Sequence, residues 1–140
     1  MNEMTLPISV SGSCLCGGVR YEVSGTPMGF DLDHCSRCRK SSGSAFKAEL
    51  LLQVRDFSWV TGSDLVRVWE APVRAQPPGY RRCFCATCGG PVPTVDADTV
   101  NIPAGTLDED PGERPERHIF VAVKAPWFDI ADALPRLSWK

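Results

Sequence analysis

The sequence predicts a mainly β protein, a single domain over residues 1–140 whose short antiparallel strands are organised around cysteine-bound metal, with little helix. Its length is common for one domain. The 12 glycines and 12 prolines are too many helix breakers for a helical bundle, and they suit short strands joined by turns. The seven cysteines fall in short clusters, which is typical of metal sites.

Apolar alternation between turn residues predicts the strands of the first half. Val19, Tyr21 and Val23 share one face of the first strand. The segment Met28–Asp33 is extended, and the latter part of Ala45–Val54 is a buried strand, although its periodicity alone would also fit a helix. A strand end and a turn follow at 59–64, and Leu65–Trp69 is another strand.

The second half reads as further short strands with long connections. Pro72–Gly79 is a loop inside the domain, and short strands continue to Ile102. The acidic, proline-rich stretch Asp108–Glu116 is a second loop. We expect a late strand over His118–Val123 and one helical turn over Ile130–Leu134.

Charge and hydropathy exclude several classes of partner. The 15 basic and 17 acidic residues give a net charge of −2, whereas nucleic-acid and anionic-membrane binders need a basic excess. No apolar run approaches the roughly 18 residues that span a bilayer, and the first residues lack a secretion signal. We therefore expect a cytoplasmic protein with no nucleic-acid or membrane partner; the oligomeric state stays open.

The cysteine spacing predicts zinc sites but leaves the pairing open, because zinc takes four ligands and each short cysteine turn supplies two. One pairing joins Cys35 and Cys38 to the turn at 85–88 as a zinc ribbon, with an insert longer than the usual roughly 15 to 20 residues. The other joins the turn at 14–16 to the turn at 85–88. It leaves Asp33, Cys35 and Cys38 as a trio with an open coordination position. A capped, inert helical turn and a redox pair are the alternatives for this trio.

Three ordered motifs and the tail resemble one known family. These are Cys-x-Cys-Gly-Gly-Val-x-Tyr-Glu from Cys14, His-Cys-x-x-Cys-Arg-Lys-x-x-Gly from His34, and Arg-x-Phe-Cys-x-x-Cys-Gly from Arg82, with a similar tail around 115–127. Together they resemble the glutathione-dependent formaldehyde-activating enzymes, and also the centromere protein V domain. The resemblance implies a mostly β fold built around two zinc positions.

The resemblance also implies the site residues. It places a structural zinc on four cysteines, namely Cys14, Cys16, Cys85 and Cys88. A second, catalytic zinc would be held by Asp33, Cys35 and Cys38, where Asp33 stands at a position that is cysteine in the family and offers a carboxylate instead. Cys83 matches no ligand position and is expected to be a strand residue.

We expect His34 to orient groups or to transfer a proton, and Arg39 and Lys40 to anchor the carboxylates of a glutathione-like ligand. The implied activity is that of a carbon-sulfur lyase acting on a small thiol adduct, with glutathione and formaldehyde giving S-hydroxymethylglutathione. The alternative is a non-catalytic, zinc-stabilised module that binds a protein partner.

Overall fold

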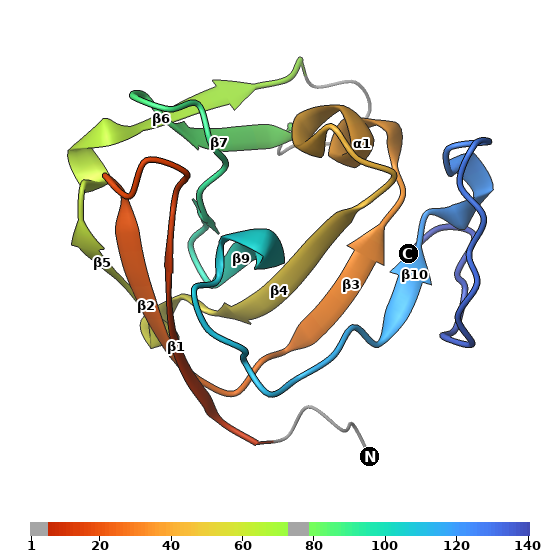
Figure 1. The fold of residues 1–140 in the computed structure, drawn as a ribbon, viewed down its shortest axis with the longest axis horizontal. Coiled ribbons are helices and arrows are strands. Elements are labelled where there is room, and N and C mark those ends of the chain that lie inside the picture. Colours follow the sequence, from red (N-terminus) through yellow and green to blue (C-terminus); the bar gives the residue numbers. More distant parts are fainter. Residues whose placement is uncertain (1–5, 73–78) are drawn as a thin grey trace.

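The computed structural model describes residues 6–72 and 79–140 as strands joined by turns, with one short α-helix (Figure 1). The strands are β1 (Ile8–Ser13), β2 (Arg20–Gly25), β3 (Gly29–Asp33), β4 (Lys47–Gln53), β5 (Phe57–Thr61), β6 (Val66–Glu70), β7 (Arg81–Cys85), β8 (Thr94–Val95), β9 (Thr99–Pro103) and β10 (Arg117–Ile119). The helix is α1 (Ser36–Ser42), and the 3-10 turns are η1 (Val54–Asp56), η2 (Ser63–Leu65), η3 (Ala104–Thr106) and η4 (Val121–Val123). The predicted mainly β fold is confirmed.

Three sheets hold these strands in the orders β1-β2-β5, β10-β3-β4-β9-β8 and β6-β7. The strand pairs within them are antiparallel except β10 with β3, which run parallel. Figure 1 shows the three-stranded sheet on one side of the molecule and β3, β4 and β10 on the other.

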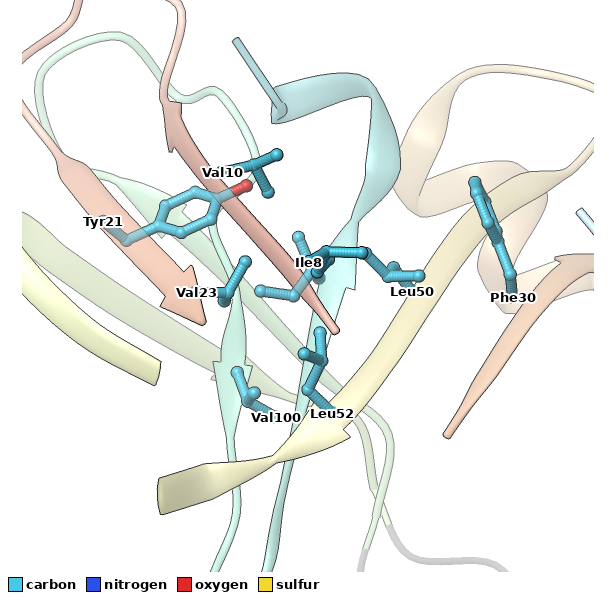
Figure 2. Packing of buried hydrophobic residues seen from close by; sticks show 9 residues of the cluster. Ile8, Val10, Tyr21, Val23, Phe30, Leu50, Leu52 and Val100 are labelled. Carbon is cyan, nitrogen blue, oxygen red and sulfur yellow. The ribbon is translucent and has the colours of Figure 1, made fainter. Parts of the chain in front are cut away.

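The main core lies between the inner faces of the two larger sheets (Figure 2). In β4, Leu50 and Leu52 are fully buried, as are their register partners Ile102 and Val100 in β9. Burial of an aliphatic side chain of this size contributes about 1.5–3 kcal/mol. Because side chains alternate along a strand, Lys47 and Glu49 of β4 face away from Leu50 and Leu52.

Most of the predicted strands are confirmed. Val19, Tyr21 and Val23 are buried on one face, with β2 beginning just after Val19. The segments predicted at 28–33 and 45–54 contain β3 and β4, and the segment predicted at 65–69 overlaps β6 except for its last residue. Asp108–Glu116 carries neither strand nor helix. Of the loop predicted over Pro72–Gly79, residues 73–78 lie outside the described part of the chain.

Two predictions for the C-terminal region are wrong. The strand predicted over His118–Val123 ends at Ile119, because Phe120 turns into the left-handed region with φ 56°. Residues 130–134 form no helical turn: the Leu134 amide donates to Asp132 Oδ1 at 3.0 Å, and the chain then runs alongside β10 at residues 135–137. The His118 amide donates to Pro135 O at 2.9 Å, and the Leu137 amide donates to His118 O at 2.9 Å.

No helix within residues 6–72 and 79–140 is long and apolar enough to cross a membrane.

Candidate metal centre and adjoining cavity

Four cysteine sulfurs converge where the chain leaves β1 and β7. The Sγ atoms of Cys14, Cys16, Cys85 and Cys88 lie within 4.8 Å of one another. The distance is 3.6 Å from Cys14 to Cys16 and 3.9 Å from Cys16 to Cys85. Tetrahedral ligation with metal–sulfur bonds of about 2.3 Å separates the sulfurs by roughly 3.8 Å. The spacing of this four-cysteine cluster therefore fits a tetrahedral metal ion.

The backbone around the cluster is arranged for thiolates, since each sulfur accepts one amide hydrogen bond. The donors are Val19 N to Cys14, Gly18 N to Cys16, Thr87 N to Cys85 and Gly90 N to Cys88, at 3.3–3.4 Å. The bond from Gly90, with further hydrogen bonds from Cys16 and Cys14, lowers the pKa of Cys88 to about 6. Such donors stabilise the deprotonated form that binds metal.

This cluster decides between the two pairings that spacing left open. Cys35 and Cys38 belong to a separate group, so the zinc-ribbon pairing with the turn at 85–88 is wrong. Cys83 is buried in β7 and lies outside both groups, which confirms it as a strand residue.

The second group is built by the end of β3 and the start of α1. One ligand-type atom from each of Asp33, Cys35 and Cys38 lies within 4.8 Å of the others. Cys35 caps α1, its sulfur accepting from Cys38 N at 3.2 Å, while Asp33 Oδ1 accepts from Cys35 N at 2.9 Å. The capped helical turn that the sequence offered as an alternative is therefore present, and it brings the three candidate ligands together. These two hydrogen bonds fix the direction of the Asp33 and Cys35 side chains.

The two thiols of this trio are not equivalent. Hydrogen bonds from the Cys38 thiol and backbone amide lower the pKa of Cys35, against the effect of burial. The same contact with Cys35, followed by burial, raises the pKa of Cys38. The pair therefore favours one thiolate and one thiol sharing a proton.

An open cavity of about 780 Å³ adjoins the trio. Its size falls in the range of sites for small organic ligands. The lining comprises the trio, polar and charged side chains, and an apolar part: Asp33, Cys35, Ser36, Arg37, Cys38, Arg39, Glu49, Tyr80, Asn101, Phe120, Val123 and Trp139.

Of the two basic residues predicted as anchors, Arg39 lines the cavity and Lys40 does not. Arg39 Nη2 donates to Val123 O at 3.5 Å, and its buried Nε has no hydrogen-bond partner among the described residues. Lys40 is exposed on the same helix, and Arg37 is a lining residue. Two arginines therefore line the space beside the trio.

Glu49 is a site residue that the sequence reasoning missed. The Cys38 thiol donates to Glu49 Oε1 at 3.7 Å, and Lys47 Nζ lies 3.6 Å from the same oxygen. Burial raises the pKa of Glu49, partly offset by Lys47. The available signal was a carboxylate on the face of β4 opposite Leu50 and Leu52.

His34 follows Asp33 but is not among the lining residues. Its ring is fully buried, and its Nε2 lies 2.8 Å from His118 Nδ1. The other nitrogen of His118 lies 3.0 Å from Asp132 Oδ2, so the three side chains form a chain of hydrogen bonds. Burial, together with His118, lowers the pKa of His34 and favours its neutral form.

Comparison with known proteins agrees with this geometry. A family model described as "Glutathione-dependent formaldehyde-activating enzyme" matches residues 9–123. The chain belongs to this family. A Halomonas elongata protein that carries the provisional name of a glutathione-dependent formaldehyde-activating enzyme is 31% identical over 126 residues, covering 86% of this chain and 80% of its own.

A crystal structure of a Rhodobacter sphaeroides protein shares the fold of this family member, with a TM-score of 0.53 and 23% sequence identity. The match covers 75% of this chain and 97% of the other.

Proposed function

We propose that the chain is a zinc-dependent carbon-sulfur lyase acting on a small thiol adduct, with glutathione and formaldehyde giving S-hydroxymethylglutathione. The observation that carries this proposal is the Asp33, Cys35 and Cys38 trio beside a cavity with two arginines, in a chain of this family. Thiolate ligands must stay reduced, and the proposal therefore places the protein in the cytoplasm.

Two zinc positions are part of the proposal. The four-cysteine cluster would hold a structural ion, supported by its sulfur spacing and its four amide donors. The trio supplies two sulfurs and one carboxylate, a ligand set that suits zinc and leaves a coordination position for substrate. A zinc ion bound there would supply Lewis acidity and favour the thiolate form of a substrate thiol.

The side chains around the trio would bind and orient the substrate. Arg37 and Arg39 can receive the carboxylates of glutathione, because a guanidinium pairs with a carboxylate through two hydrogen bonds. Lys40 adds positive charge at longer range from the exposed side of α1. Holding the thiol and the aldehyde together lowers the entropy cost of their reaction.

The reaction itself needs little rearrangement. In the synthetic direction the thiol sulfur attacks the carbonyl carbon and the carbon–sulfur bond forms. The carbonyl oxygen takes up the proton that the thiol releases. In the reverse reaction the carbon–sulfur bond breaks and the hydroxyl proton returns to the sulfur, which regenerates the thiol and the aldehyde. We propose that His34 orients the Asp33–Cys35 segment, because its amide donates to Ile119 O at 3.0 Å and its ring contacts His118.

The test is the rate of exchange between formaldehyde and its glutathione adduct, followed by NMR with ¹³C-formaldehyde. We expect zinc-loaded wild-type protein to accelerate exchange over the spontaneous rate, and Cys35→Ser to lose most of the acceleration. Cys83→Ser is the matched control, since that thiol belongs to neither metal group. No acceleration by the wild type would contradict the lyase and favour the non-catalytic binding module.

A further inference from the structure

The C-terminal residues 124–140 lie outside the part matched by the family model, yet they help to build the cavity. The Phe120 amide donates to Trp139 O at 2.8 Å, and the Val121 amide donates to Leu137 O at 3.0 Å. Figure 1 shows the chain end returning to the side of β10. These bonds bring Trp139 to the cavity, next to Phe120.

Phe120 is held in an unfavourable backbone conformation at this place. Its φ of 56° is the one positive φ of a non-glycine residue within the described chain. The left-handed region is unfavourable for an ordinary residue because Cβ comes too close to the following carbonyl oxygen. Strain of this kind persists where surrounding contacts impose it, and it is concentrated at ligand sites.

The rings of Phe120 and Trp139 form one apolar surface. Their centroids lie 6.2 Å apart at an interplanar angle of 79°, an edge-to-face pair. Trp139 is 59% exposed and Val123 is 40% exposed, so this surface is turned to solvent and is not part of the protein core. All three side chains line the cavity that holds the trio.

We infer that Phe120 and Trp139 form a subsite for an apolar substituent on the aldehyde partner, so that the substrates extend beyond formaldehyde to the thiol adducts of aromatic aldehydes. The inference rests on the proposed function. Formaldehyde carries no substituent that could cover these rings, whereas an aromatic group would bury them and remove apolar area from water. The carboxylates of the thiol would pair with Arg37 and Arg39 in the same cavity.

Two unreactive thioethers of glutathione distinguish binding at this subsite from binding of the glutathione part of the ligand. S-benzylglutathione carries an aromatic group at the position of the adduct carbon, and S-methylglutathione does not. By calorimetry on the zinc-loaded protein, we expect S-benzylglutathione to bind at least about tenfold more tightly, the effect of burying one such group. Trp139→Ala should reduce this preference to below about threefold, with the backbone bond to Trp139 O retained.

Trp127→Ala is the matched control, because Trp127 is 71% exposed and is not a lining residue. It should keep the preference for the benzyl compound, and circular dichroism checks the fold of both variants. Equal affinity of the wild type for the two compounds, or a preference that survives in Trp139→Ala, would overturn the subsite and leave the proposed function standing. Failure of both compounds to bind the wild type would also overturn the subsite, whereas the proposed function stands or falls separately with the formaldehyde exchange rate.

Discussion

Cys16 offers the most selective test of the four-cysteine cluster. Its side chain is exposed, whereas Cys14 and Cys85 are buried. Replacing Cys16 by serine therefore removes a proposed metal ligand with little loss of packing. We expect Cys16→Ser to lose about one metal ion per chain and to lower the thermal midpoint by more than about 5 °C, because structural zinc contributes directly to folding.

Cys83→Ser is the control for that experiment, since Cys83 is buried beside the cluster and contributes no ligand. It should lower stability through packing and polarity while the metal content stays at the wild-type level. Metal content that is unchanged in Cys16→Ser would show that the cluster does not hold the ion.

Tyr21 makes folding sensitive to alkaline pH. Its ring is buried in the core, its hydroxyl lies 2.6 Å from Thr106 Oγ1, and burial raises its pKa to about 12. The folded state therefore favours the neutral phenol. The stability that this provides is complete below the unfolded pKa of about 10 and is lost as pH rises from about 10 to 12, by up to roughly 2–3 kcal/mol.

Denaturant titrations at pH 8, 10 and 11.5 measure this loss, and Tyr21→Phe should show a flatter decline over the same window. A variant that loses stability as steeply as the wild type would mean that Tyr21 is not responsible.

At the scale of elements, the turn between β5 and β6 depends on Gly62. Its φ is 79°, and a Cβ there would lie 2.0 Å from the backbone oxygen of Gly18. We expect Gly62→Ala to cost about 1–2 kcal/mol for the backbone conformation and about 1–3 kcal/mol more for the clash. Urea denaturation measures the change in the free energy of unfolding.

Gly112 is a matched control because its φ is also 79° but no atom lies within 4 Å of a Cβ placed there. Gly112→Ala should cost only the conformational part. Equal losses in the two variants would indicate that the close approach to Gly18 is not important.

The elements differ in how far the sequence could predict them. The strand around Tyr21 was predictable from the alternation of its apolar residues, and the strand around Leu50 from an apolar run flanked by turn residues. The end of β10 was not, because Phe120 leaves the strand through hydrogen bonds to residues nearly twenty positions later. The apolar segment 118–123 carries no local signal for that contact.

The residues of the candidate site also differ in how far the sequence could predict them. The trio was predictable as a group because Asp33, Cys35 and Cys38 are neighbours in sequence and one turn of chain brings them together. Glu49 and Trp139 could not be assigned, since strand pairing of β3 with β4 and the return of the tail place them there. His34 was predicted as a site residue, but its buried ring contacts His118 and does not line the cavity.

At the scale of the whole molecule, stability should be uneven between the sheets. β4 lies inside the five-stranded sheet with Leu50 and Leu52 fully buried, whereas β6 belongs to the two-stranded sheet and is largely exposed. Local opening is easiest where few apolar groups are buried. In native-state hydrogen exchange, we expect β4 amides to exchange at least about tenfold more slowly than β6 amides; equal protection would contradict this arrangement.

The two-site account is tested most directly by the zinc content of the reduced, chelator-free protein, measured by elemental analysis beside Cys35→Ser. Cys35 belongs only to the trio, so all four cysteines of the other cluster are kept in this variant. The account predicts about two zinc ions per chain in the wild type and about one in Cys35→Ser. About one zinc ion in both proteins would contradict the second site and, with it, the proposed chemistry.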